Sequence, residues 1–330
     1  MRKVLYLIIY VSLLFLSACD VHEWPETSEF VKCHLRLNYE TDITEYEHLY
    51  DGTSVIEQGL GETYDNHREY GKIRYIIRTY PLSETMRTAS DFTQEFVFTK
   101  DISKGYAHEV TLDLLPGNYN IMVWSDLVKS SGNTYFYNTD NFAEITLQSD
   151  HKGNNDYRDA FKGKVNISLP TNSTYQINQK INIDMKRPLA KFEIIANDLS
   201  DFIEAKHGDI NLYKAKIQYV GFMPNVYSII ADRPVASITG EILESTLTKL
   251  TDTEVSMGFD YVFVSDRGST VTVRIGIYDN KGQQVSLSEP ITIPVKPSHH
   301  TLIRGKFLMQ NTTNGVNINP NWGGDYNIIL

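Results

Sequence analysis

The sequence predicts an all-β protein that contains two successive β-sandwiches. Short stretches of alternating apolar and polar residues recur along the 330-residue chain, and turn residues separate them. No stretch keeps a helical period for more than about two turns. Aromatic residues make up 12% of the chain, which suits pleated, half-buried strand surfaces. Many short strands spaced by turn residues are typical of sandwiches.

The first predicted strand covers residues 30–39. Apolar residues occupy one face of this strand and polar residues the other, because side chains alternate between the two faces. The apolar face consists of Val31, Cys33, Leu35, Leu37 and Tyr39. Cys33 is therefore expected to point inward and to behave as a small core hydrophobe.

The rest of the chain divides into two series of predicted strands. Residues 41–70 are polar and irregular, so a long loop is expected there. The first series has strands at 72–80, 92–99, 106–114, 119–124, 142–148, 165–169 and 181–185. The second has strands at 189–196, 212–222, 257–264, 270–278, 285–287, 291–295, 301–309 and 326–330, with a short helix at 199–206. A break near residues 184–188 predicts sandwich domains at 30–186 and 187–330, each able to fold alone.

Composition narrows the class of protein. The chain has 41 acidic against 31 basic residues and a net charge of −10, whereas a nucleic-acid binder would need a basic face. Two cysteines cannot build a disulfide framework. No internal run reaches the roughly 18 apolar residues of a spanning helix.

The first 18 residues have the pattern of a signal peptide. Arg2 and Lys3 give a positive start, and the nearly apolar stretch 4–16 is too short to span a membrane. Residues 16–19, Leu-Ser-Ala-Cys, resemble the lipobox of bacterial lipoproteins. That resemblance implies cleavage between Ala18 and Cys19 and acyl chains, such as palmitate, on Cys19. Several acyl chains give stable anchoring, so we expect a lipid-anchored outer-membrane protein with a tether at 19–29.

We find no motif for catalysis, metals or cofactors in the sequence. Nucleophile elbows and phosphate-binding glycine loops are absent, so we expect no enzyme, no bound metal and no cofactor. His299 and His300 are neighbours on a predicted strand and should point to opposite faces. The carboxylates of residues 45–69 are the best enzyme or calcium candidate, although a solvated acidic loop is favoured. Trp124, Tyr135 and Tyr137 could instead form a platform on which sugars stack.

Several segments together resemble a known family. Residues 114–124, a strand, a Pro-Gly turn and a strand ending in Trp, resemble a hairpin of Bacteroidales-type fimbrillins and fimbrium-anchor lipoproteins, including FimB-like subunits. Residues 187–194, 219–225 and 301–308 are also similar to segments of that family. The resemblance implies two tandem transthyretin-like Greek-key β-sandwiches in an exported lipoprotein. It also implies a role in adhesion and in fimbrium assembly by β-strand complementation, with no catalytic residues.

The resemblance leaves the type of subunit open. A stalk subunit would be cut by a protease, and Arg68 is the only basic residue in 41–70 at which such a cut could fall. An anchor would keep its lipid and its first strand, with residues 326–330 as its own last strand. The expected partners are the outer membrane, other fimbrial subunits, and a host or bacterial surface receptor. The alternative function is a lipid-anchored glycan-binding protein of a carbohydrate-uptake system.

Overall fold

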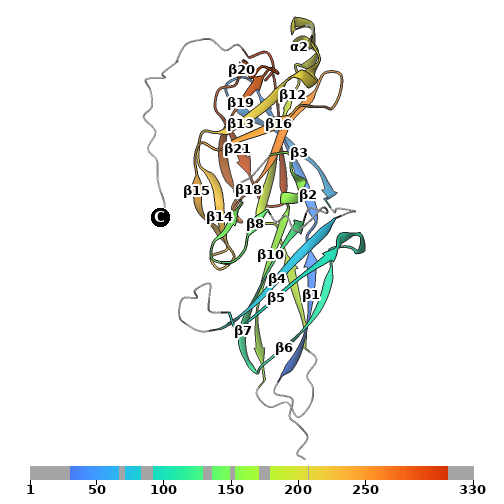
Figure 1. Ribbon diagram of the computed structural model, residues 1–330, viewed down its shortest axis with the longest axis vertical. Helices are drawn as coiled ribbons and strands as arrows, with labels where there is room; N and C mark the ends of the chain where they lie inside the picture. The colour runs from blue at the N-terminus through green and yellow to red at the C-terminus, as the bar shows by residue number, and fades with distance from the viewer. Residues whose placement is uncertain are drawn as a thin grey trace, which may run out of the picture.

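The computed structural model describes residues 30–66, 71–82, 92–128, 136–148, 153–170, 179–206 and 208–310. Two β-sandwiches are arranged end to end along the long axis of the molecule (Figure 1). The start of β1 lies at one tip, and helix α2 lies at the opposite end. The prediction of an all-β fold with two sandwiches is therefore confirmed.

The N-terminal sandwich packs a three-stranded sheet against a four-stranded sheet. The first sheet has the order β11-β1-β6 and the second the order β10-β7-β4-β5. Alternating side chains of both sheets meet in one buried cluster that includes Leu35, Ile77 and Val123. The strands are β1 (Val31–Tyr39), β4 (Lys72–Pro81), β5 (Gln94–Asp101), β6 (His108–Leu114), β7 (Gly117–Val128), β10 (Ala160–Leu169) and β11 (Gln179–Met185).

The C-terminal sandwich has a six-stranded sheet of order β17-β18-β12-β22-β2-β3. The facing sheet has the order β16-β13-β19-β20, with β21 also paired to β19. The second buried cluster fills the space between them. The strands are β2 (Asp42–Tyr50), β3 (Val55–Asp65), β12 (Leu189–Ala196), β13 (Lys214–Tyr219), β16 (Ile242–Thr246), β17 (Thr248–Lys249), β18 (Val255–Phe263), β19 (Ser269–Tyr278), β20 (Gln284–Leu287), β21 (Ile291–Val295) and β22 (His299–Gly305).

A small sheet and a few helical turns complete the described fold. The sheet has the order β15-β14-β9-β8 and contains β8 (Tyr137–Asn138), β9 (Ile145–Leu147), β14 (Met223–Ser228) and β15 (Arg233–Ile238). The helix α2 (Leu199–Lys206) lies where a short helix was predicted. The 3-10 turns are η1 (Ile102–Lys104), η2 (Asp156–Arg158) and η3 (Ile210–Leu212).

The expected loop at residues 41–70 is wrong, because the structure places β2 and β3 there. Strand β2 pairs in parallel with β22 and antiparallel with β3. The predicted division at residues 186 and 187 therefore differs from the sheet topology, since both strands belong to the sheet of the C-terminal sandwich. The strand signal was weak because β3 is an edge strand with mostly exposed side chains. The inward face of β2 carries Tyr46, His48 and Tyr50 rather than aliphatic residues, so no aliphatic face marks this strand.

A third buried cluster joins the two sandwiches. Trp124 from β7 and Ile76 from β4 come from the N-terminal sandwich, and Leu189 and Phe263 come from the C-terminal one. Apolar burial of this kind contributes roughly 25 cal/mol per Å². The junction is therefore a shared core.

The topology predicts that neither half melts cooperatively when it is expressed alone. A piece covering 187–330 lacks β2 and β3, which leaves β22 unpaired along one edge, and a piece covering 30–186 carries those strands without their sheet. Circular dichroism of each half and of their mixture measures this. We expect the mixed halves to assemble and to show much of the cooperative thermal unfolding of the intact chain. A half that melts alone within a few degrees of the intact chain would contradict the shared-sheet account.

Candidate functional site

The first strand is the middle strand of its sheet. β1 pairs in parallel with β11 on one side and antiparallel with β6 on the other. Its inward side chains Val31, Cys33, Leu35 and Leu37 are at most 2% exposed. Removal of β1 would leave β11 and β6 without a common neighbour and would expose a groove lined by core side chains.

The prediction that Cys33 is a core residue is confirmed. Its side chain is buried, and its sulfur lies 3.8 Å from the carbonyl oxygen of Val31. Burial, with a smaller effect from Asp113, raises the pKa of the Cys33 thiol to about 11. The thiol is therefore protonated at neutral pH and shielded from reagents.

We expect Cys33 to report whether β1 is in place. In the folded chain the thiol should resist alkylation, and it should label fully in denaturant. Mass spectrometry after timed iodoacetamide treatment measures this with the mature chain, in which Cys33 and Cys19 are the two cysteines. Labelling of native Cys33 at the rate of a free peptide would show that β1 leaves the sheet readily.

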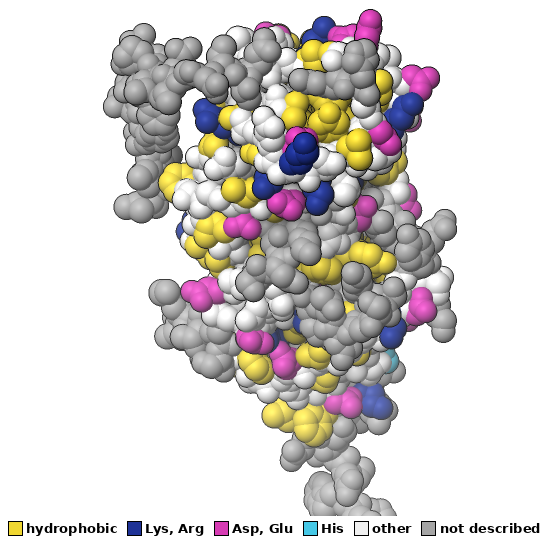
Figure 2. Space-filling view, turned by 45° about the horizontal axis from the view of Figure 1, so that its top comes forward, with side chains coloured by type: hydrophobic (Ala, Val, Ile, Leu, Met, Phe, Trp, Pro, Cys, Tyr) yellow, Lys and Arg dark blue, Asp and Glu magenta, His cyan; other side chains and the backbone are white. Residues whose placement is uncertain are grey.

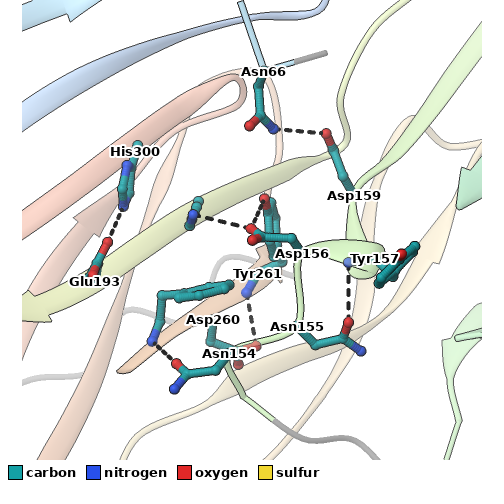
Figure 3. Close-up of polar contacts among 12 residues, drawn as sticks. Asn66, Asn154, Asn155, Asp156, Tyr157, Asp159, Glu193, Asp260, Tyr261 and His300 are labelled. Atoms are coloured by element: carbon teal, nitrogen blue, oxygen red, sulfur yellow. Dashed lines mark hydrogen bonds and ion pairs between the residues drawn. The ribbon is translucent and has the colours of Figure 1, made fainter. Parts of the chain in front are cut away.

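The outward face of the six-stranded sheet carries a polar network around His300. His300 Nδ1 lies 3.4 Å from Glu45 Oε1 and 3.2 Å from the hydroxyl of Tyr64. His300 Nε2 lies 3.2 Å from Glu193 Oε2, a contact drawn in Figure 3. The Ser256 hydroxyl donates to the other Glu193 oxygen at 2.5 Å. This network joins β2, β12, β18 and β22 across the sheet.

The expected opposite orientation of the two histidines is confirmed. The ring of His299 packs against Tyr46 with centroids 4.8 Å apart, on the face opposite to the contacts of His300. No group of three or more His, Cys, Asp or Glu side chains within the described residues is arranged to hold a metal ion.

The acidic residues of 45–69 do not gather in one site. Glu45 contacts His300, and Glu47 accepts from Arg304 at 2.8 Å. Asp51 accepts from the backbone N–H groups of Thr53 and Ser54, which fixes the turn between β2 and β3. Glu45, Glu47 and Asp51 are therefore occupied in structural contacts.

We expect the protein to lose stability in acid as Glu45 and Glu193 become protonated. The interaction with His300 lowers the pKa of Glu45, and contacts with His300 and Ser256 lower the pKa of Glu193 even though burial acts to raise it. Both pKa values are depressed, so the two groups add stability above about pH 4.3 and lose it as the pH falls through their folded pKa values. Glu193→Gln should show a shallower decline of unfolding free energy below that pH. Parallel declines in the variant and the wild type would contradict this.

The predicted sugar platform is wrong for the two residues that can be placed. Trp124 is 0% exposed and Tyr137 is 1% exposed. Their rings pack edge to face 5.4 Å apart in the junction core. Apolar side chains of both sandwiches cover the faces that a sugar would need. Tyr135 lies outside the described residues.

The processing sites lie outside the described part of the chain. This applies to Ala18 and Cys19, to Arg68, and to the last predicted strand at 326–330. Within the described residues, no helix has the length and apolar character needed to cross a membrane.

The segment 153–159 at the junction carries polar residues that sequence reasoning missed. Arg158 is buried and pairs with Asp260, and it also donates to the carbonyl oxygen of Tyr261 at 2.6 Å. Asp159 accepts from Arg187 Nε at 2.9 Å. Figure 3 shows this segment packed along β18, with Asp156 beside Tyr261. A polar run ahead of a strand resembles a loop in sequence, so nothing local indicated its buried partners.

These features define an all-β protein whose two sandwiches are joined by a shared apolar and ionic junction. The match to a family of unknown function, DUF6562, extends over residues 26–330, and the chain belongs to that family. No curated protein matches the sequence.

Solved structures resemble this fold at low identity. A candidate adhesin from Bacteroides thetaiotaomicron is 10% identical with a TM-score of 0.44, over 86% of this chain and 95% of that chain. A candidate cell adhesion protein from Bacteroides eggerthii is 10% identical with a TM-score of 0.43, over 84% and 88%. The fimbrial anchor protein Mfa2 from Porphyromonas gingivalis is 13% identical with a TM-score of 0.39, over 78% and 82%. Likeness at this level assigns no function, so the function has to be argued from this chain.

Proposed function

We propose that the protein is a lipid-anchored cell-surface fimbrial subunit or fimbrium anchor of the FimB-like kind. It would act in adhesion and fimbrium assembly and would carry no catalytic activity. The observation that carries the proposal is the first strand, which follows the lipobox closely and is the middle strand of its sheet. A lipid on Cys19 would hold the protein at the outer membrane through this strand.

The first strand also supports the intact form over a cleaved stalk subunit. A cut after Arg68 would separate β1, β2 and β3 from the rest of the chain. β1 is the middle strand of the N-terminal sheet, and β2 lies between β22 and β3 in the C-terminal sheet. Their loss would open both sandwiches at once, whereas strand exchange needs a single groove. We therefore propose that the chain keeps residues 19–68 in place.

The position of the first strand suggests an orientation on the membrane. Residues 20–29 separate Cys19 from the first described residue, and ten residues reach at most about 35 Å. The start of β1 is at the tip of the N-terminal sandwich (Figure 1), so this tip would lie nearest the membrane. The C-terminal sandwich would face outward. Apolar side chains gather on the surface at that end (Figure 2), where Ile203 of α2 and Leu212 of η3 are exposed.

The outward half offers sheet edges for other subunits. Among the strands that the structure describes, β3 pairs with β2 alone, and its side chains Ile56 and Leu60 are 47% and 62% exposed. An edge with unpaired backbone groups and apolar side chains can accept another strand. The alternative, a glycan-binding protein of a carbohydrate-uptake system, is not supported by the buried Trp124 and Tyr137.

Detergent partitioning tests the lipid anchor. Cys19→Ala should leave the protein in the aqueous phase or as uncleaved precursor, because the lipobox then has no sulfur to carry the lipid. Cys33→Ala is the matched control, since it removes the other cysteine without touching the lipobox, and it should partition into detergent like the wild type. Equal detergent partitioning of both variants would refute the anchor.

A further inference from the structure

A cavity of about 240 Å³ opens between the two sheets of the C-terminal sandwich. β2, β3 and β22 contribute one wall, and β21 and the turn before β19 contribute the other. The side chains that give it chemical character are Tyr46, His48, Glu57, Arg267, Lys296 and His299. No functional role discussed above uses this cavity.

Its charged residues are two cations and one carboxylate. Arg267 and Lys296 are both exposed at the cavity, and within the described residues neither forms an ion pair. A guanidinium and an ammonium placed together favour a carboxylate or phosphate. Glu57 on β3 adds an acceptor, which suits hydroxyl donors on the same ligand. The set therefore fits a ligand that carries both an anionic group and hydroxyl groups.

A largely buried histidine, His48, also lines the cavity, opposite Glu57 on the neighbouring strand. His48 is only 5% exposed, and neither ring nitrogen forms a hydrogen bond within the described part of the chain. Burial lowers the pKa of His48, so the neutral ring offers one donor and one acceptor. A ligand in the cavity could hydrogen-bond to this ring.

The aromatic wall and the volume set the size and shape of the ligand. The rings of Tyr46 and His299 pack against each other with centroids 4.8 Å apart. Such a wall suits the flat C–H face of a sugar ring. Pockets for drug-sized ligands occupy roughly 300–1,000 Å³, and this cavity is smaller. It has room for one sugar ring.

We propose that this cavity binds a single acidic sugar residue, such as a uronic or sialic acid at the end of a surface glycan. The carboxylate lies between Arg267 and Lys296, the hydroxyl groups contact Glu57 and His48, and one ring face contacts Tyr46. The inference deepens the proposed adhesive function and rests on it for its biological meaning. The cavity is on the C-terminal sandwich, which the lipid anchor would hold away from the membrane.

Saturation-transfer NMR with the full mature chain in detergent micelles tests the site. The probes are methyl glucuronide and N-acetylneuraminic acid, with methyl glucoside as the neutral control. Inorganic phosphate, which has no carbon-bound protons, is added as a competitor, and its affinity is read from the loss of the sugar signals. We expect at least one acidic sugar to bind about tenfold more tightly than glucoside and than phosphate. Arg267→Ala and Lys296→Ala should each weaken that binding about tenfold, and Tyr46→Ala should remove the signals of the ring protons. Arg233→Ala and Lys281→Ala, exposed cations away from the cavity, should bind like the wild type.

Three results would overturn the acidic-sugar site. They are no binding of either acidic sugar, no acidic sugar that binds more tightly than glucoside, and unchanged acidic-sugar binding in Arg267→Ala. Phosphate that binds as tightly as the acidic sugars would also overturn it, because the cavity would then recognise the negative charge and not the sugar. These measurements do not depend on the lipid at Cys19, so failure here is distinguishable from failure of the anchor.

Discussion

Replacing Arg158 with methionine should lower the free energy of unfolding by about 3–5 kcal/mol, because it leaves a buried carboxylate without its cation. Arg158 and Asp260 are 2% and 1% exposed, and they join the segment before β10 to β18. Without the guanidinium, Asp260 keeps the hydroxyl of Tyr219 at 2.7 Å but loses its charge partner. Denaturant unfolding followed by tryptophan fluorescence measures the change.

Two further variants test whether the loss of stability comes from removing the cation that pairs with Asp260. Arg158→Met with Asp260→Leu removes both charges and should recover much of the loss. Lys249→Met breaks an exposed pair with Asp252 and should leave the midpoint nearly unchanged. A decrease of less than about 1 kcal/mol in the single Arg158 variant would contradict a buried ion pair at the junction.

Replacing Trp124 with alanine should cost about 3–5 kcal/mol of stability, since it empties a fully buried site. The indole lies in the cluster that joins the sandwiches, and its Nε1 donates to Asp126 at 3.2 Å. Asp126 also accepts from Arg74 at 2.8 Å, so the ring packs beside a second buried ion pair. Thermal melting followed by circular dichroism measures the loss.

The matched control for Trp124 is an exposed aromatic residue. Phe222 is 67% exposed, so Phe222→Ala should leave the melt close to that of the wild type. Trp124→Phe should fall between the wild type and Trp124→Ala, because it leaves a smaller cavity. A Trp124→Ala protein that melts like the wild type but loses sugar binding would instead support the predicted stacking of sugars on Trp124.

Alternation predicted those strands that have one buried and one exposed face. β1, with Val31, Cys33, Leu35 and Leu37 inward, is the clearest case, and β11 and β19 behave similarly. β2 and β3 were not predicted as strands, because neither shows a regular alternation of buried apolar and exposed polar side chains. The outward face of β2 carries Glu45 and Glu47 in ionic contacts, and the side chains of β3 are mostly exposed.

The junction could not be predicted from local sequence, because its partners lie far apart in the chain. Arg158 and Asp260 are 102 residues apart, and no spacing rule links them. Trp124 precedes Ser125 and Asp126 near the end of β7, which resembles an exposed strand end. The surfaces that bury Trp124 include the C-terminal sandwich. Similarly, the cavity at His48 combines residues of β2, β3, β21 and β22, which only the folded topology brings together.

Intact-mass and N-terminal analysis of the protein taken from its native cell surface tests the central claim most directly. The claim is that the chain is lipidated at Cys19 and keeps its first strand in the sheet. We predict a mature chain that starts at Cys19, carries acyl chains on that residue, and extends without a break through β1, β2 and β3. A new N-terminus at Glu69 without the lipid would contradict the claim and would indicate a cleaved stalk subunit.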